Sequence, residues 1–214
     1  MRQKSNPTVI GLTGNIATGK STVLGMLEEL GAEIIDADRL VHQLIRQDIE
    51  IQQSILNEFG DQVLSSDGSI DRKALGSIVF DNPLKLQVLE DIIHPAVGRE
   101  VERVITATEA DGLIIEAIKL LESELVNRCD YIWVTDCPED VQLGRLVSER
   151  AMTPDEALTR IRVQPLQSIK LSRADIIIDT GGSLEWTRDQ VDLAWAQCIT
   201  GTVDETGRQI DWVS

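Results

Sequence analysis

Cysteine and histidine are scarce in this chain of 214 residues, and their scarcity limits the metal chemistry open to it. The three cysteines, Cys129, Cys137 and Cys198, are odd in number and widely spaced, and the two histidines are His42 and His94. This spacing is typical of reduced thiols in a cytosolic protein rather than of a disulfide framework or a CxxC zinc site. We therefore do not expect a structural zinc ion.

Long apolar runs are also missing. No stretch approaches the ~20 residues that a membrane-spanning helix needs. The N-terminal residues Met1 to Pro7 lead directly into a strand-like run, without the apolar segment of a signal peptide. We therefore expect a cytoplasmic protein that does not act at a membrane.

Basic residues are outnumbered, with 20 Lys and Arg against 36 Asp and Glu, for a net charge of −16. Such a charge repels nucleic acid and anionic lipid, so we expect no nucleic-acid partner. An anionic substrate would need cations gathered locally around it. A few cations would suffice, because salt screens charges that lie beyond the Debye length, which is ~8 Å at physiological ionic strength, and the acidic surface further away then has little effect.

Short β-branched apolar runs alternate with longer stretches of helical periodicity, which predicts an α/β fold with a parallel sheet. Residues 22–30 and 141–149 are predicted as crossover helices. Gly31 is expected just past the end of the first, and Pro138 at the first position of the second. The five predicted strands are Thr8 to Thr13, Glu33 to Ile35, Leu113 to Ile118, Tyr131 to Asp136 and Ile176 to Asp179.

The interval of about 38–111 is too long for one crossover and is predicted as a helical insertion. Within it, Pro83 is expected to open one helix, and His94-Pro95 to mark a boundary before another. A smaller helical excursion at about 150–173 is predicted as a mobile lid, and the polar segment after Thr200 as loosely ordered. The expected organisation is one domain over 1–214 whose core comprises about 8–37, 112–150 and 174–198.

A phosphate-binding loop is the most specific motif in the chain. Residues 14–21 read Gly-Asn-Ile-Ala-Thr-Gly-Lys-Ser, a full match to GxxxxGK[ST]. The expected strand and helix flank it, and both are needed because backbone N–H groups and the helix N-terminus must converge on the β-phosphate. Lys20 is then expected to reach the β- and γ-phosphates, and the Ser21 hydroxyl to bind Mg²⁺. The expected nucleotide-binding residues are Gly14, Asn15, Ala17, Thr18, Gly19, Lys20, Ser21 and Thr22.

The loop alone does not select among P-loop proteins. The chain lacks the NKxD base-reading motif of regulatory GTPases and is short for a motor. These absences favour a metabolic phosphotransferase that uses ATP and Mg²⁺.

Several motifs in order resemble the dephospho-CoA kinase family. The segment from Gly11 to Thr22 is similar to the family's GLTGGIGSGKST loop, and Ile35-Asp36-Ala37-Asp38 to its IDAD segment. Further matches, from about Val9 to Val191, are Asp67-Gly68-Ser69-Ile70-Asp71-Arg72 with Leu75 and Val79-Phe80, Ile93-His94-Pro95, Gln142-Leu143-Gly144-Arg145-Leu146, and Arg160-Ile161 with Gln164, Lys170, Ala174-Asp175 and Ile178-Asp179.

The chain departs from the family pattern at three places. Asn15 and Ala17 stand where the family usually has glycine, and alanine accepts a left-handed backbone conformation less readily than asparagine does. Residues 119–122 replace a PLLFE segment, without its proline and with one residue fewer. Glu149 stands where an arginine is common, with Arg150 beside it, and a one-residue shift turns a helical side chain by ~100°.

The resemblance implies a P-loop NTPase fold with a five-stranded parallel sheet in the order 2-3-1-4-5, a helical CoA-binding insertion and a small helical lid. It implies transfer of the ATP γ-phosphoryl group to the 3′-hydroxyl of dephospho-CoA, which gives CoA and ADP and completes coenzyme A biosynthesis. We expect a monomer or weak homo-oligomer. Two alternatives stay open: another small-molecule kinase acting on a nucleotide or nucleoside, and a non-catalytic nucleotide-dependent binding protein.

Lys20, Asp38 and Arg145 are the expected catalytic residues. The resemblance favours Asp38 as the base that deprotonates the acceptor hydroxyl, whereas the alternative is an N-cap for the helical segment 39–46. Asp36 is expected to support Mg²⁺ or to hold the backbone.

Two other polar residues have competing interpretations. The resemblance implies that Arg145 contacts ATP phosphates, and the alternative is an ion pair with Glu149 on a solvated helix face. Asp136 ends the fourth predicted strand, where it is a candidate Mg²⁺ partner. The preferred interpretation is a helix cap before Pro138.

Overall fold

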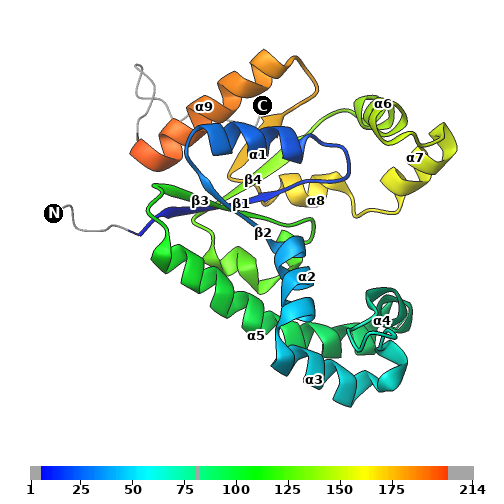
Figure 1. The fold of residues 1–214 in the computed structure, drawn as a ribbon. Helices are drawn as coiled ribbons and strands as arrows, with labels where there is room; N and C mark the ends of the chain where they lie inside the picture. The colour runs from blue at the N-terminus through cyan, green and yellow to red at the C-terminus, as the bar shows by residue number, and fades with distance from the viewer. Residues whose placement is uncertain (1–5, 81, 202–214) are drawn as a thin grey trace. The chain divides into compact units, whose positions relative to one another are not determined.

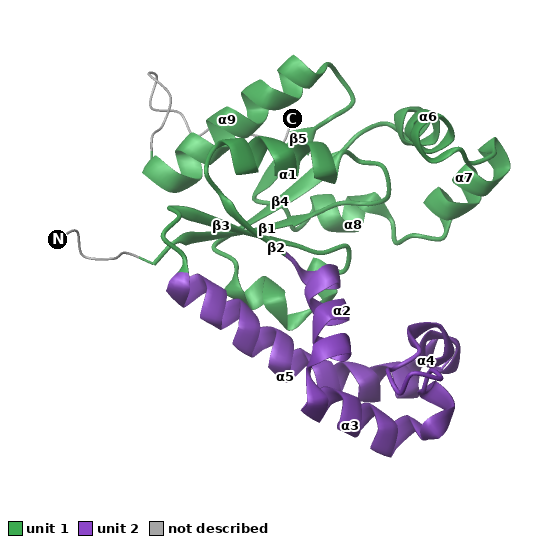
Figure 2. Ribbon diagram, viewed as in Figure 1, with its two compact units in different colours: residues 1–35, 108–214 green, residues 36–107 purple. Residues whose placement is uncertain are grey.

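The computed structural model describes residues 6–80 and 82–201 (Figure 1). The residues cluster into two compact units: residues 1–35 with 108–214, here the core unit, and residues 36–107, here the helical unit (Figure 2). The polar segment expected to be loosely ordered falls, from residue 202 onward, outside the described residues. None of the described helices is both long enough and apolar enough to cross a bilayer.

The described part of the chain forms one five-stranded sheet in the order β2-β3-β1-β4-β5. Strands β1, β3, β4 and β5 pair in parallel, for example through Ile10 opposite both Ile114 and Tyr131. The predicted fold class and strand order are confirmed. The strand bounds are β1 Thr8–Thr13, β2 Glu33–Asp36, β3 Gly112–Glu116, β4 Tyr131–Asp136 and β5 Ile176–Asp179.

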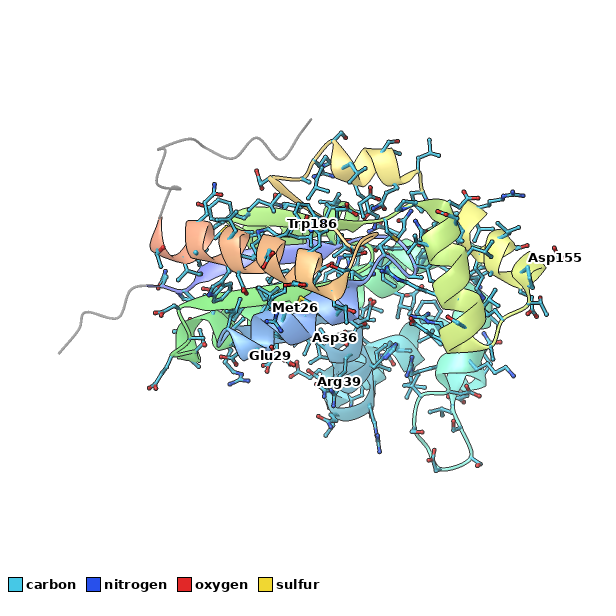
Figure 3. The ribbon with its side chains drawn as sticks, turned by 90° about the horizontal axis from the view of Figure 1, so that it is seen from above. Met26, Glu29, Asp36, Arg39, Asp155 and Trp186 are labelled. Atoms are coloured by element: carbon cyan, nitrogen blue, oxygen red, sulfur yellow. The ribbon has the colours of Figure 1, made fainter. Side chains whose placement is uncertain are left out.

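Two helices cover one face of this sheet. Helices α1 (Lys20–Glu29) and α9 (Leu184–Thr200) lie side by side (Figure 3). Arg188 of α9 donates hydrogen bonds to the Met26 carbonyl and the Glu29 carboxylate of α1. The buried core joins strand residues such as Ile10 and Trp133 to both helices. Buried parallel strands read as almost continuous apolar runs, so this region was the easiest to predict.

The opposite face near β1 is covered by a short turn structure. Gly11 leaves room for it, because a Cβ there would stand 2.6 Å from Leu120 Cδ2 and 2.8 Å from Cys129 Sγ. Leu120 opens the 3-10 turn η2 (Leu120–Glu122), and η3 (Glu124–Arg128) precedes Cys129. Residues 119–122, which depart from the family's PLLFE pattern, are thus held in place by burial of Leu120 and by a hydrogen bond from Arg173 to the Leu121 carbonyl (2.8 Å).

Three helices lie between β4 and β5: α6 (Glu139–Arg150), α7 (Pro154–Arg162) and α8 (Gln167–Leu171). The prediction that Pro138 occupies the first helical position is wrong by one residue, because Pro138 is the N-cap and supplies no side-chain cap. Gly31 follows the end of α1 with φ 89°, as expected for a residue past a helix C-terminus.

The helical unit contains α2 (Ala37–Gln47), α3 (Ile49–Phe59), the 3-10 turn η1 (Asp61–Val63), α4 (Arg72–Val79) and α5 (Pro83–Ala107). Pro83 opens α5 as predicted, but the boundary predicted at His94-Pro95 is wrong, because α5 continues through Pro95. Proline removes one backbone hydrogen bond from a helix. The buried Ile93, Ala96 and Val97 offset that loss, since α5 packs against α2, α3 and α4.

Candidate active site

The phosphate-binding loop joins β1 to α1, at the edge where the parallel strands end and where open α/β sheets bind ligands. Its two motif glycines are required by close packing. A Cβ at Gly14 would stand 2.3 Å from Thr135 Oγ1, and one at Gly19 would stand 2.9 Å from Thr180 Oγ1. Gly19 also has φ 85°, which places it in the left-handed region. The loop is therefore packed against the residues that end β4 and follow β5.

The N-terminus of α1 is arranged to receive an anion. Helix α1 begins at Lys20, and its N-cap Gly19 supplies no side-chain acceptor to the first turn. The Lys20 ammonium donates to the Gly14 carbonyl (2.8 Å), so it lies across the loop. Ser21 and Thr22 are exposed. Backbone N–H groups at a helix start, with a lysine beside them, favour binding of a phosphate group.

Thr18, one of the expected nucleotide-binding residues, directs its side chain into the protein. Its hydroxyl donates to the Asn15 carbonyl (2.8 Å) and lies 2.7 Å from Thr135 Oγ1. The residue is only 1% exposed. Thr18 therefore holds the shape of the loop through its side chain, and only its backbone remains suited to a phosphate.

Ala17 adopts the left-handed conformation that the sequence comparison made questionable, with φ 58°. An L-residue in this region costs roughly 1–2 kcal/mol. Such strain persists where neighbouring contacts hold the residue in place. One of these contacts comes from Arg145, whose Nη1 donates to the Ala17 carbonyl at 3.0 Å.

Arg145 on α6 links the loop to the end of β5. Besides Ala17, its guanidinium donates to the hydroxyl of Thr180 (3.1 Å) and to the Thr180 carbonyl. The alternative interpretation, an ion pair with Glu149, is wrong, because these backbone and hydroxyl acceptors hold the guanidinium instead. Glu149 and Arg150 are both exposed at the end of α6.

Cys137 lies beside this arginine, with its Sγ 3.6 Å from Arg145 Nη1. Burial raises the pKa of the Cys137 thiol, and the charge of Arg145 opposes that rise only in part. The thiol therefore stays protonated and unreactive at neutral pH. All three cysteines lie within the described residues, and none forms a disulfide.

Asp136 does not cap a helix, so the preferred interpretation of this residue is wrong. It is the last residue of β4, and its Oδ1 accepts a hydrogen bond from Gln167 Nε2 (3.1 Å). Gln167 Nε2 also donates to the Thr135 carbonyl (2.9 Å). A helix cap would have to lie next to α6, but Pro138 holds that position.

Sequence reasoning assigned no role to Gln164 and Gln167, yet both contact the loop. Gln164 Oε1 accepts from the Ile16 N–H (2.8 Å), and Gln167 Oε1 from the Asn15 N–H (3.3 Å). The Asn15 side chain donates to the Pro165 carbonyl (3.0 Å). Gln164 was already visible as a family-motif residue, but nothing in one sequence shows which distant backbone group it meets.

Lys170 is the third residue whose role was missed. It is 3% exposed, and its ammonium donates to Thr13 Oγ1 (3.2 Å) and to the Ile118 carbonyl. Burial lowers the pKa of this ammonium, while Glu122 and Glu116 oppose that shift. Lys170 thus fastens α8 to the ends of β1 and β3, and the part of the predicted lid from Gln164 onward is anchored to the core unit.

Asp36 and Asp38 belong to the start of α2. Asp36 is the N-cap, and its Oδ1 accepts from the Arg39 N–H at 2.8 Å (Figure 3). Asp38 lies in the first turn and is exposed. The interpretation of Asp38 as the cap is therefore wrong. Asp36 has an extended backbone and ends β2, whereas Asp38 is already helical, so the two carboxylates do not belong to one extended chain segment.

No group of three or more His, Cys, Asp or Glu side chains among the described residues is arranged to hold a metal ion. Mg²⁺ bound with a nucleotide does not require such a group, because it keeps several waters and takes one or two protein ligands beside substrate phosphates. The exposed hydroxyl of Ser21, directly after Lys20 at the start of α1, suits such a ligand.

Comparison with known proteins decides among P-loop families. The sequence model of dephospho-CoA kinase matches residues 8–185. The chain belongs to the dephospho-CoA kinase family. A curated dephospho-CoA kinase of Carboxydothermus hydrogenoformans is 43% identical over 186 residues, which cover 86% of this chain and 90% of that protein.

Solved structures agree with the family assignment. A crystal structure of a Thermus thermophilus protein matches with a TM-score of 0.77 at 29% identity, covering 90% of this chain and 98% of that one. The dephospho-CoA kinase of Campylobacter jejuni matches with a TM-score of 0.66 at 26% identity, covering 91% of this chain and 98% of that one.

Proposed function

We propose that this chain transfers the γ-phosphoryl group of ATP to the 3′-hydroxyl of dephospho-CoA, forming CoA and ADP. The observation that carries the proposal is the family match over residues 8–185, joined to an intact phosphate-binding loop between β1 and α1. The activity is that of an ATP-dependent phosphotransferase with an alcohol acceptor, the last step of coenzyme A biosynthesis. We place it in the cytoplasm, as a monomer or weak homo-oligomer without nucleic-acid or membrane partners.

Lys20 and Arg145 are the cations proposed to act on the nucleotide. Lys20 already lies across the loop, where its ammonium donates to the Gly14 carbonyl, an acceptor that phosphate oxygens can replace. Arg145 fixes the Ala17 carbonyl and thereby the conformation of the loop. Its planar guanidinium carries five donors, so those not engaged by the loop suit phosphate oxygens. Phosphoryl transfer depends chiefly on such positioning and charge neutralisation.

Mg²⁺ is proposed to bind through the Ser21 hydroxyl, with Asp36 as a candidate second contact. When bound, Mg²⁺ neutralises charge on the β- and γ-phosphate oxygens. One oxygen of Asp36 is occupied by the Arg39 N–H, which leaves the other for a metal-bound water or for the ion. The loop residues after Ile16 contribute backbone N–H groups to the phosphates, whereas the N–H groups of Asn15 and Ile16 are bound by Gln167 and Gln164.

Asp38 is proposed as the group that orients and deprotonates the acceptor hydroxyl. Its exposed side chain has no hydrogen bond or ion pair to any residue in the described part of the chain. A carboxylate without a fixed partner can accept a proton from a hydroxyl, whereas Asp36 is committed to capping α2. The helical unit, which begins at these aspartates, is proposed to bind the CoA moiety.

A coupled ADP-release assay tests the proposal. Dephospho-CoA should stimulate ADP release far above the background, whereas AMP, CMP and adenosine should not. Equal or faster turnover with AMP, CMP or adenosine would indicate another small-molecule kinase. ADP binding without stimulation by any acceptor would indicate a non-catalytic binding protein.

A further inference from the structure

The segment from Gln164 to Gln167 is bound to the phosphate-binding loop through three hydrogen bonds. Gln164 and Gln167 accept the N–H groups of Ile16 and Asn15, and the Asn15 side chain donates to the Pro165 carbonyl. These N–H groups precede Ala17, so the contacts are made at the entrance of the loop rather than at its helical end. A phosphate at the start of α1 does not compete for them.

These contacts bracket a strained residue. The Ile16 N–H lies before Ala17 and is held by Gln164 at 2.8 Å, while the Ala17 carbonyl lies after it and is held by Arg145 at 3.0 Å. A change of the Ala17 φ of 58° to a negative value would move at least one of these groups away from its partner. Gln164 and Arg145 therefore together hold Ala17 in a backbone conformation that alanine does not favour.

Gln164 is itself fixed from the other side. Its Nε2 donates to the Arg160 carbonyl (3.0 Å) near the end of α7, so the amide bridges α7 to the loop. Gln167 is fixed in the same manner, because its Nε2 donates to the Thr135 carbonyl and to Asp136. Side chains held at both ends lose little further freedom when they position the loop.

We propose that Gln164 is a positioning residue that holds the phosphate-binding loop, with its left-handed Ala17, in the conformation that binds the nucleotide phosphates. The proposal rests on the proposed function only in assuming that the loop binds ATP and ADP. Under this proposal, nucleotide binding depends on Gln164 because residue 17 is alanine. With glycine there, the same conformation carries no strain and needs less support.

A four-protein comparison tests the proposal: the wild type, Gln164→Ala, Ala17→Gly and the double variant. The measurement is the dissociation constant of Mg·ADP without any acceptor, by calorimetry. Gln164→Ala should weaken binding about 10-fold, the equivalent of one net hydrogen bond. Ala17→Gly alone should stay within about 3-fold of the wild type, and the double variant should recover most of the lost affinity. Gln53→Ala, at an exposed glutamine of α3, is the matched control and should bind as the wild type does.

Two results would overturn the proposal. One is unchanged ADP affinity in Gln164→Ala. The other is that Gln164→Ala weakens ADP binding equally whether residue 17 is alanine or glycine. Should Gln164→Ala fail to fold, hydrogen exchange of the wild type decides, because the Ile16 amide must be protected without nucleotide. Exchange of that amide at an unprotected rate would exclude the contact. A wild type that binds no ADP would refute the proposed function, whereas the Ile16 amide would still report on the contact.

Discussion

Replacing Gly14 by alanine tests whether the phosphate-binding loop is packed against β4 as the structure shows. The new Cβ would stand 2.3 Å from Thr135 Oγ1, 2.7 Å from Thr18 Oγ1 and 2.8 Å from the Thr135 carbonyl. Thr135 is fully buried and Thr18 is 1% exposed, so neither has open space to move into. The hydrogen bond between their hydroxyls, at 2.7 Å, would be broken.

The expected cost has two parts. Overpacking of a close-packed site costs about 1–3 kcal/mol. Leaving a buried hydroxyl without its partner costs a further 1–3 kcal/mol, approximately. We therefore expect a loss of about 2–6 kcal/mol in the free energy of unfolding. For a chain of this size, that loss lowers Tm by roughly 10 °C.

Gly25→Ala is the matched control for this change. Gly25 lies inside α1, and a Cβ there would meet no atom within 4 Å. Alanine in a helix interior is more favourable than glycine by about 0.5–1 kcal/mol, so Tm should rise by roughly 2 °C. Differential scanning calorimetry measures both variants. A Gly14→Ala variant that melts within about 2 °C of the wild type and keeps its ADP affinity would refute the packing argument.

Three further predictions concern the proposed roles. Lys20→Ala should lower kcat at least ~10³-fold with little change in Tm, and near-normal turnover would refute its role. Arg145→Lys should lower kcat/KM by ~10²-fold, because one ammonium cannot replace the forked donors, whereas Arg150→Lys should act as the wild type. Asp38→Asn should lower kcat ~10²-fold at nearly constant ATP affinity, and Asp36→Asn should mainly alter Mg²⁺ dependence or Tm. Steady-state kinetics and melting curves decide each case, and the base assignment fails if the two aspartate variants show the opposite pattern.

Features set by local chemistry were predictable from the sequence. Three of the five strands have the predicted bounds, because buried parallel strands are continuous apolar runs between turn residues. The loop motif was equally clear, since its glycines, lysine and serine have fixed positions. The left-handed conformation expected to be difficult for Ala17 is the one it adopts.

Features that depend on tertiary contacts were not predictable. The chain continues as a helix through Pro95 because buried neighbours on both sides stabilise α5, a fact that local propensity does not contain. Asp36 rather than Asp38 caps α2, since the helix begins earlier than expected. The contacts of Gln167 and Lys170 join residues far apart in the sequence, so their partners become apparent only in the fold.

The central claim is that this chain phosphorylates the 3′-hydroxyl of dephospho-CoA. The most direct measurement follows ATP and dephospho-CoA by ³¹P NMR in the presence of Mg²⁺ and identifies where the new phosphomonoester forms. The account predicts a single new phosphomonoester resonance, that of the 3′-phosphate of CoA, which grows together with the diphosphate resonances of ADP and does not form with a 3′-deoxy acceptor. A phosphomonoester at another position, or equal ADP release with the 3′-deoxy acceptor, would contradict the account.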